Sequence, residues 1–491
     1  MIQQKSFEGL ANLEKRLAED LSYLQLPAAE WVPVTEFNGR RVLDVAIVGG
    51  GMCGLVASAS LKLLGITNTV CLDRAPEGLE GPWVTFARME TLRSPKQLTG
   101  PALGLPALTF RAWYVAQFGE QAWEALGKIP RTQWMEYLVW YRKVLSLPVR
   151  NRVTVLELKP ARDDLIEIAV RDDAAGSVET LYARHVVLAT GRDGLGGGHV
   201  PDFVRTVNRK FWAHSADDID FAQLKGKRIG VVGAGASAMD NAATALEEGA
   251  ASLDLFIRRK DLPRVNKFTG ISSQGVVHGF AGLEDAWKWK FLDYVLRAQT
   301  PPPRDSTLRV SRHPNARFHL GTPVIGFEER GGAAVIKTPK GDFDLDFVIF
   351  ATGFKVDLSQ RPELQHFAPY IRFWQDSFTP QPGMDNSELA TSPYLGTGFE
   401  FTEKTPGSCP ALKQIHCFNY PATLSHGKLS GDIPAVSDGA NRLAKSIARS
   451  LFVADCQLHF ERLVGFDTPE LLGDEWADAG ENAVLEQDTA G

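Results

Sequence analysis

The stretch VLDVAIVGGGMCG, residues 42–54, decides the fold of this chain. Its first seven residues form a short β-rich run that ends in glycines, which predicts a buried strand followed by a turn. Gly49, Gly51 and Gly54 have the spacing GxGxxG. The first glycine permits a tight turn, the second lets the backbone approach a pyrophosphate, and the third lets the next helix pack close to the strand. The free N–H groups of that helix then face the phosphates. We predict a dinucleotide site here, and a purely structural turn is the alternative.

The segment that follows the predicted helix supports a nucleotide ligand. Residues 69–72 read as the next strand, and Asp73 comes directly after it, 24 residues beyond Gly49. A carboxylate at this distance from the glycines can accept hydrogen bonds from a ribose diol. We therefore place Asp73 and the neighbouring Arg74 in the predicted cofactor site.

A second stretch, RIGVVGAGASA at residues 228–238, repeats the design of a strand that ends in glycines. Here the spacing is GxGxxA. The two sites lie 184 residues apart with dissimilar sequence between them, so we predict two related nucleotide-binding units. The residues assigned to the second site are Gly233, Gly235, Ser237 and Ala238.

The strand after the second glycine loop ends in basic residues. Residues 252–257 form the predicted strand, and Arg258 and Arg259 follow it where the first unit has its carboxylate. A guanidinium suits a 2′-phosphate better than a free diol, so this site is predicted to prefer NADPH to NADH. The alternative is that the two arginines only cap a strand end at the surface. One site that ends in Asp and one that ends in Arg favour two different dinucleotides, a flavin and a nicotinamide.

Two further strands end in Ala-Thr-Gly, at residues 185–191 and 347–354. With these motifs the chain resembles the two-dinucleotide-binding flavoproteins, in which such strands mark the crossings between the FAD and NADPH domains. The resemblance covers roughly residues 40–455. It implies FAD and NADPH as cofactors and places Thr190 and Thr352 beside them.

Within that group the chain is most similar to the class B flavin-dependent monooxygenases. Thr91–Pro95 is similar to the Thr-Leu-Arg-Asp-Pro of the ornithine and lysine N-hydroxylases, and 264–268 resembles their substrate-contacting Phe-Val-Asn-Glu loop. Residues 425–433 are similar to their His-Gly-x-x-Asp flavin-facing turn, and 81–83 resembles the Gly-Gly-x-Trp of flavin-containing monooxygenases. The resemblance implies cofactor contacts by Trp83, His426 and Asp432, and catalytic roles for Arg93 and Asn266. A core position is the alternative for His426, and a helix cap is the alternative for Asp432.

The chain departs from each of these groups. Around His214 only the His-Ser end of the identifying motif is present. The substrate-binding Lys of the N-hydroxylases falls near Ala87, with Arg88 as a substitute, and the catalytic-side Asn of flavin-containing monooxygenases falls on Arg93. We expect Arg93 to orient the nicotinamide or stabilise a peroxide; an ion pair with a surface carboxylate is the alternative.

The predicted fold class is α/β, with two Rossmann-like dinucleotide-binding domains and the NADPH domain inserted into the FAD domain. An amphipathic N-terminal helix is expected to pack on the body or on a partner subunit, which would make a homo-oligomer. A helical stripe of Trp134, Tyr137, Leu138 and Tyr141 is expected to be core, with a cofactor contact as the alternative. Trp287 and Trp289 are expected to pack an inserted helix. The C-terminal segment has eight acidic residues and no Lys or Arg, and is expected to be solvated. The predicted units are a helical extension (1–37), the FAD domain (38–195 and 346–464), the NADPH domain (196–345) and the acidic tail (465–491).

Composition excludes several classes of protein. The 491 residues carry 53 Lys and Arg against 59 Asp and Glu, a net charge of −6, which argues against a nucleic-acid partner. Five cysteines with no CxxC pair exclude a disulfide scaffold and a cysteine-type zinc site, and fit a cytoplasmic protein. No run of about 18 uncharged apolar residues occurs, so we predict no membrane partner. No metal ligands are predicted.

The sequence thus predicts an FAD- and NADPH-dependent monooxygenase that forms a C4a-(hydro)peroxyflavin and transfers one oxygen atom to a small molecule. The resemblance favours N-hydroxylation of an amine; S-oxidation and Baeyer–Villiger oxidation are further options. The alternative is an NADPH-dependent reductase that passes electrons to a disulfide or a protein, but no cysteine pair has the required spacing. A non-catalytic flavoprotein is a third option, and the arginines after the second glycine loop argue against it.

Overall fold

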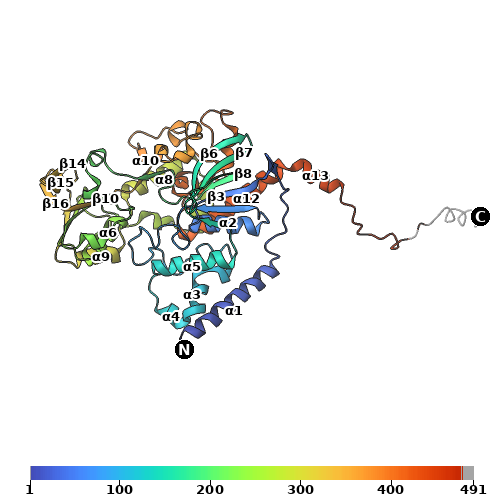
Figure 1. Ribbon diagram of the computed structural model, residues 1–491, viewed down its shortest axis with the longest axis horizontal. Helices are drawn as coiled ribbons and strands as arrows, with labels where there is room; N and C mark the ends of the chain where they lie inside the picture. The colour runs from blue at the N-terminus through green and yellow to red at the C-terminus, as the bar shows by residue number, and fades with distance from the viewer. Residues whose placement is uncertain (1, 477, 479–491) are drawn as a thin grey trace, which may run out of the picture.

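The computed structural model describes residues 2–476 and 478, which form a main domain, an inserted domain and a projecting C-terminal segment (Figure 1). The main domain is built on a seven-stranded sheet of order β5-β4-β3-β8-β7-β6, with β19 paired to β8. Strands β3, β4, β5, β8 and β19 run parallel, whereas β6 and β7 are antiparallel additions. The strands are β3 (Leu43–Val48), β4 (Thr69–Asp73), β5 (Val149–Asn151), β6 (Val153–Arg162), β7 (Leu165–Asp172), β8 (Val178–Leu188) and β19 (Ile415–Cys417).

The long strand β8 joins the two halves of this sheet. Its first half pairs with β7, and its second half lies between β3 and β19. Because β19 comes from the C-terminal part of the chain, the main domain is built from segments that lie on both sides of the inserted domain in the sequence. Helices α2 (Met52–Leu63) and α12 (Val436–Ala454) pack against each other, although they lie far apart in the sequence.

Helices near the N-terminus cover the main domain on one side (Figure 1). The aromatic stripe of α5 forms core, as expected for such spacing: Trp134, Tyr137 and Tyr141 are all buried. Leu13 and Leu17 of α1 are buried as well, so this helix packs on the body of its own chain. The helices are α1 (Ile2–Tyr23), α3 (Phe110–Phe118), α4 (Glu120–Ala125) and α5 (Arg131–Val144); a small hairpin, β1 (Glu36–Phe37) and β2 (Arg40–Arg41), follows α1.

The inserted domain has a five-stranded, fully parallel sheet of order β10-β17-β11-β12-β13. A three-stranded antiparallel sheet, β14-β15-β16, lies at its far end (Figure 1). The elements are β10 (Trp212–His214), β11 (Arg228–Val232), α6 (Ala236–Glu247), β12 (Ser252–Ile257), α9 (Arg304–Ser311), β13 (Ala316–Leu320), β14 (Gly326–Arg330), β15 (Ala333–Thr338), β16 (Gly341–Leu345) and β17 (Phe347–Phe350).

The two passages between the domains run side by side. Strand β9 (Gly196–Gly198) enters the inserted domain and pairs antiparallel with β18 (Phe354–Val356), which leaves it. This arrangement confirms the predicted α/β fold with one dinucleotide-binding domain inserted into the other. The boundary differs from the predicted 345/346, because β17 pairs with β10 and β11 and so completes the inserted sheet before the chain returns.

A helical layer lies where the inserted domain meets the main domain. Its apolar core contains Phe268, Phe280, Trp289, Trp374 and Leu424, all buried. Trp289 was expected to pack an inserted helix, and its indole N–H donates to the carbonyl of Met384 at 2.9 Å. The helices are α7 (Gln274–Gly279), α8 (Asp285–Ala298), α10 (Ser387–Ala390) and α11 (Thr423–His426).

The chain ends in a segment that leaves the body. Helix α13 (Cys456–Val464) follows α12, and residues 465–476 are exposed and without regular secondary structure, as predicted for a solvated tail. The rest of the predicted acidic tail, 477 and 479–491, lies outside the described residues. Among residues 2–476 and 478, no helix has the length and apolar character needed to cross a bilayer.

Candidate cofactor and active site

Of the three glycines in the first loop, Gly51 leaves space beside the backbone for a ligand, whereas Gly49 and Gly54 are packed against neighbouring backbone. Gly49 has φ +106°, and a Cβ there would lie 2.6 Å from the carbonyl oxygen of Ala189. A Cβ on Gly54 would lie 1.9 Å from the oxygen of Gly49. A Cβ on Gly51 would meet no heavy atom nearer than 3.7 Å. The loop is therefore packed tightly against the sheet at Gly49 and Gly54. It is open at the N-terminus of α2, where a pyrophosphate would bind.

Asp73 holds this loop in place. The carboxylate is buried at the end of β4; one oxygen accepts the N–H of Gly50 at 2.7 Å, and the other accepts the N–H of Ala75 at 2.7 Å. Each oxygen keeps a second lone pair that a ribose hydroxyl can use. The next residue, Arg74, is exposed. The ribose role of Asp73 thus fits the geometry and stays a prediction.

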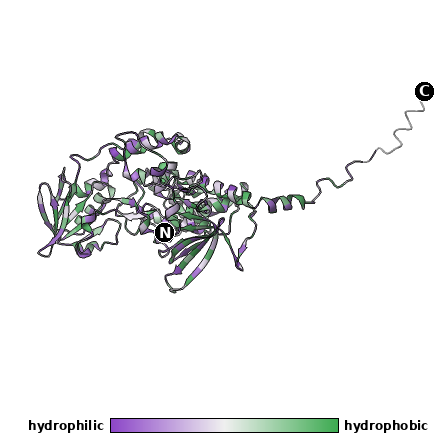
Figure 2. Cartoon of the chain, turned by 90° about the horizontal axis from the view of Figure 1, so that it is seen from above, coloured by the Kyte–Doolittle hydropathy of each residue, from purple (hydrophilic) through white to green (hydrophobic). Residues whose placement is uncertain are grey.

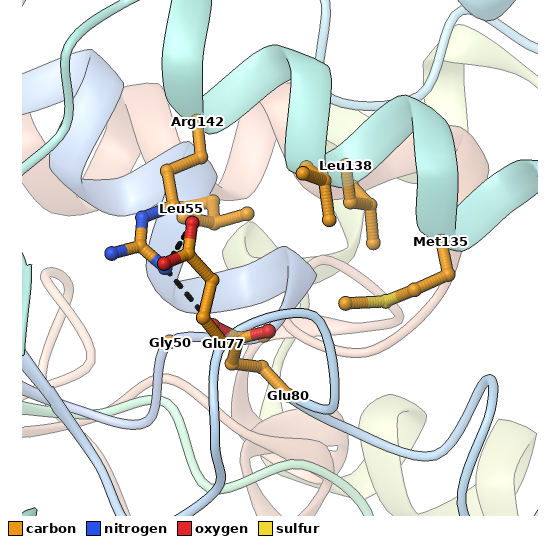
Figure 3. Close-up of a pocket in the computed structure, with 9 residues that line it drawn as sticks. Gly50, Leu55, Glu77, Glu80, Met135, Leu138 and Arg142 are labelled. Atoms are coloured by element: carbon orange, nitrogen blue, oxygen red, sulfur yellow. Dashed lines mark hydrogen bonds and ion pairs between the residues drawn. The ribbon is translucent and has the colours of Figure 1, made fainter. Parts of the chain in front are cut away.

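A recess lies beside the first glycine loop, between α2, α5 and residues 77–80 (Figure 3). The guanidinium of Arg142 lies 3.1 Å from Glu80 and 3.8 Å from Glu77, and the Asn151 amide also donates to Glu80 at 2.6 Å. Met135 and Leu138 supply an apolar wall. The recess thus combines ion-paired and apolar side chains, a lining that suits the nucleoside end of a dinucleotide.

Several buried polar atoms of the main domain have no hydrogen-bond partner within the described part of the chain. They are the indole nitrogens of Trp83 and Trp134, the side-chain oxygen of Gln133 and Nε of Arg88. The two indoles pack edge to face at 6.2 Å, and the Arg131 guanidinium donates to the carbonyl of Trp83. Buried polar atoms without partners are rare in folded proteins, so these atoms fit contacts to bound FAD. Sequence motifs pointed to Trp83 and Arg88 but missed Gln133, which no spacing pattern marks.

The second glycine loop repeats the geometry of the first. Gly233 has φ +142°, and a Cβ there would lie 2.5 Å from the oxygen of Ala351. A Cβ on Gly235 would meet no heavy atom within 4 Å, and Ser237 beside it is exposed at the N-terminus of α6. Ala238 is buried, with its Cβ 3.3 Å from the position of a Gly233 Cβ. This loop is therefore open toward solvent at the point where NADPH phosphates would bind.

The two arginines after β12 lie in different surroundings. Arg258 is exposed and forms no ion pair within the described structure. The Arg259 guanidinium donates to the carbonyl of Arg297 at the end of α8, at 2.6 Å. Arg258 is thus the freer of the two for a 2′-phosphate, which the sequence did not distinguish.

The segments that carry Asn266 and Asp432 approach each other between the two domains, through Phe268 and Lys428. Lys428 lies 3.3 Å from a carboxylate oxygen of Asp432 and 4.4 Å from the ring centroid of Phe268, two residues after Asn266. Partial burial lowers the pKa of Arg93, and the nearby Asp432 carboxylate opposes this. Segments from both domains therefore meet at one place.

Within the described structure, one polar group at this place has no partner, and a second forms an ion pair with Lys428. The side-chain oxygen of Asn266 is buried and has no partner in the described structure. Asp432 begins the 3-10 helix η13 (Ile433–Ala435), but its side chain makes no capping bond. The missing capping bond argues against the helix-cap role of Asp432, and its contact with the flavin stays a prediction.

His426 differs from the prediction that it contacts the flavin. One ring nitrogen lies 2.9 Å from the carbonyl oxygen of Gly396, the other lies 3.4 Å from Arg442, and the ring stacks on Phe399 at 4.0 Å. Burial lowers the pKa of His426 to about 3, so the ring is neutral. Because both nitrogens already contact the protein, we correct its role to that of a core residue.

Thr190 and Thr352 stabilise the ends of their strands. The Thr190 hydroxyl donates to the carbonyl of Gly194 at 2.9 Å and accepts from the Asn419 amide at 3.1 Å. The Thr352 hydroxyl donates to the carbonyl of His199. Both threonines thus shape the crossings between the domains, and their direct contact with a cofactor stays a prediction.

Arg309 of α9 connects the two domains. Its guanidinium donates to both oxygens of Glu247 on α6, at 2.6 and 2.8 Å, and to the carbonyl of Arg88 in the main domain at 3.2 Å. Arg88 in turn lies 5.2 Å from the ring of Phe221 in the inserted domain. A small recess between residues 90–93 and α9 marks this junction.

The thiols do not form a redox pair. All five cysteines are free, and Cys456 alone among them is exposed. Burial raises the pKa of both Cys53 and Cys71 to about 12, so neither forms a thiolate at neutral pH. A dithiol reductase needs such a thiolate.

Comparison with known proteins agrees with this geometry. A family model described as FAD-NAD(P)-binding matches residues 46–193, and the model of the L-lysine 6-monooxygenase/L-ornithine 5-monooxygenase family matches residues 121–275. The chain is 39% identical to the FAD-dependent urate hydroxylase of Xanthomonas campestris over 477 residues, which cover 95% of this chain and 98% of that protein.

Solved structures share the fold at low sequence identity. The ornithine hydroxylase of Pseudomonas aeruginosa matches with a TM-score of 0.65 and 16% identity, over 84% of this chain and all of that one. The L-lysine 6-monooxygenase of Pseudomonas syringae matches with a TM-score of 0.64 and 16% identity, over 83% and 99% of the two chains.

Fold, glycine loops and matches together define a flavoprotein enzyme with two dinucleotide sites. The chain belongs to the class B flavin-dependent monooxygenases, in the same family as the urate hydroxylase. The predictions of a monooxygenase and of FAD and NADPH as cofactors are confirmed.

Proposed function

We propose that this chain hydroxylates urate, or a closely similar oxidised purine, with FAD, NADPH and O₂. The observation that carries the proposal is the 39% identity to a urate hydroxylase along nearly the full length of both chains. Bound FAD supplies the redox chemistry: once reduced by NADPH it reacts with O₂, so that one oxygen atom goes to the substrate and the other leaves as water.

Three arginines near the junction support an anionic substrate. Arg88, Arg93 and Arg131 form no ion pair with any carboxylate of the described structure within 4.0 Å. Burial and the neighbouring charge of Arg131 lower the pKa of Arg88, and the Asp218 carboxylate opposes this shift. Urate is a planar anion at neutral pH, and a guanidinium fork suits a planar anion. The same cations also suit dinucleotide phosphates.

Asn266 supports a substrate with ring N–H groups. Its buried side-chain oxygen lacks a donor within the described structure and can accept an N–H of a purine ring. Leaving such an oxygen unpaired costs about 1–3 kcal/mol, which a bound lactam recovers. We assign Asn266 to substrate orientation and Arg93 to the charge that develops next to the flavin.

N-hydroxylation of an aliphatic amine is the second candidate. The family model that supports it matches residues 121–275, which include Asn266. Its weakness lies near Ala87, where the N-hydroxylases are expected to carry the substrate-binding Lys and this chain has Arg88 only as a substitute. We also propose a cytoplasmic location, in keeping with five unpaired thiols.

The test compares urate with L-ornithine, L-lysine and cadaverine on the purified holoenzyme. We expect urate to accelerate NADPH oxidation and to disappear in a one-to-one ratio with NADPH, with one atom of ¹⁸O₂ in the product. Hydrogen peroxide is measured in parallel, since peroxide equal to the NADPH consumed reports uncoupled turnover. Coupled conversion of an amine with no loss of urate would replace the first proposal by the second.

A variant separates substrate binding from flavin chemistry. Asn266→Ala should raise the KM for urate by roughly five- to a hundredfold, the worth of about 1–3 kcal/mol, because a buried hydrogen bond to the substrate is lost. Anaerobic reduction of the flavin by NADPH should stay unchanged. An unchanged KM would remove Asn266 from the substrate site.

A further inference from the structure

The end of α12 and helix α13 carry large apolar side chains that no described part of the chain covers. We call residues 452–466 the C-terminal arm. None of the α13 residues is buried. Exposed fractions run from 58% to 72% for a set of arm residues that comprises Val453, Phe460, Leu463, Val464 and Phe466. Figure 2 shows the arm leaving the body at the end opposite the inserted domain.

The arm is held to the body along one side only. Trp31, in the linker after α1, packs against Phe452 at 6.3 Å and against His459 at 5.9 Å, and His459 stacks on Phe452 at 4.5 Å. The Arg462 guanidinium donates to the carbonyl of Trp31 at 3.0 Å. These contacts give α13 a defined direction, so its uncovered side is a surface and not a frayed end.

The uncovered side is one face of a helix. Phe460, Leu463 and Val464 have the spacing i, i+3 and i+4, which places them together. With Phe466 these side chains are 58% to 72% exposed. They present roughly 500 Å², the size of the largest and often functional apolar patch on a monomer and the greater part of the ~800 Å² that each partner buries in a standard interface. Exposed to water, such an area would strongly favour association.

We propose that this face binds the same face of a second copy of the chain. A two-fold contact sets this face against the same face of the second copy, and Phe460, Leu463 and Val464 carry no charge, so no like charges meet at its centre. An anionic lipid surface fits less well, because residues 465–476 carry four acidic and no basic side chains. The dimer joins the copies through their main domains and leaves both inserted domains free to meet NADPH.

This assignment moves the homo-oligomer contact away from the N-terminal helix. Leu13 and Leu17 of α1 are buried against the chain's own body, so that helix has little apolar surface left for a partner. The contact lies outside the active site, so the proposal does not depend on the identity of the substrate.

The test measures the mass of the FAD-loaded full chain by light scattering after size exclusion, at about 10 μM. We expect twice the mass of one chain. The double variant Phe460→Glu and Leu463→Glu should be monomeric and should keep its bound FAD and its rate of flavin reduction by NADPH. Leu458→Glu is the matched control: it makes the same change on the opposite side of α13 and should leave the dimer intact.

Three outcomes would overturn the proposal. The first is a monomeric wild-type chain at 10 μM, and the second is a dimer that survives the double substitution. The third is a monomer that floats with vesicles containing phosphatidylserine, which would show that the face binds lipid. Retained FAD and flavin reduction ensure that a monomeric double variant is folded.

Discussion

Arg258 and Arg259 follow the same strand but differ in the contacts that their guanidinium groups already form. Arg258 is exposed without an ion pair in the described structure, whereas Arg259 donates to the Arg297 carbonyl. Arg258→Ala should therefore raise the KM for NADPH about ten- to a hundredfold, the worth of ~1.5–3 kcal/mol for a charged hydrogen bond, with little effect on the KM for NADH. Steady-state kinetics with both coenzymes checks this.

Arg259→Ala serves as the comparison. It should change the KM for NADPH less than Arg258→Ala does, because the Arg259 guanidinium already donates a hydrogen bond to the Arg297 carbonyl. If Arg258→Ala weakens NADPH and NADH equally, the arginine does not recognise the 2′-phosphate.

A buried carboxyl in β3 gives a pH-dependent stability. Burial raises the pKa of Asp44 to about 6, although Arg184, which forms a bidentate pair with Asp455 at 2.7 and 3.0 Å, opposes the shift. Since the folded protein binds this proton more tightly than the unfolded chain does, the carboxyl's contribution to stability falls as the pH rises from about 4 to 6 and then stays constant. At neutral pH a buried charge therefore destabilises the fold.

Asp44→Asn should remove that cost. We expect the free energy of unfolding in urea to rise by about 1–3 kcal/mol at pH 7.5, and the gain to vanish near pH 4. Exposed Asp163→Asn should change little at either pH. A gain for Asp44→Asn that is equal at both pH values would contradict the assignment.

At the scale of elements, α1 illustrates how an amphipathic pattern is converted into packing. Leu17 is 2% exposed against the main core, and the Trp140 indole donates to Glu14 at 2.9 Å. Leu17→Ala should lower the free energy of unfolding by about 2–4 kcal/mol, because it leaves a cavity under the helix. Lys15→Ala, on the exposed side, should be close to neutral. Thermal or urea unfolding distinguishes a packed helix from a loose extension, for which both variants would be neutral.

Elements with a strong local signal were predictable, and those that depend on distant partners were not. The glycine loops and the aromatic stripe of α5 follow from spacing alone. The position of β17 does not, because its Ala-Thr-Gly end looks like that of β8 although its hydrogen bonds go to β10 and β11. For the same reason a His-Gly motif suggested a flavin contact for His426, whose ring the tertiary structure instead places against Phe399.

At the scale of the whole molecule, catalysis needs the two domains at a fixed distance. Arg309 binds Glu247 on its own domain and the Arg88 carbonyl on the other. Arg309→Ala should slow reduction of the flavin by saturating NADPH roughly three- to tenfold, because a small misplacement of the nicotinamide raises the barrier. Bound FAD should be unchanged.

Stopped-flow absorbance under anaerobic conditions measures that rate. Arg304→Ala, at the exposed start of the same helix, is the control and should reduce at the wild-type rate. Equal rates for Arg309→Ala and the wild type would show that the link does not position the domains.

The sequence by itself determined the fold class, the two glycine loops, their carboxylate and arginine partners, and the cofactors. Each depends on residues close together in the chain, whose turns and periodicity neighbouring side chains dictate. Only the tertiary structure brought Phe268, Lys428 and Asp432 together, revealed the unpaired buried oxygen of Gln133, and left the C-terminal arm uncovered. These features depend on segments that lie far apart in the sequence, and local sequence patterns do not determine which distant segments will contact each other.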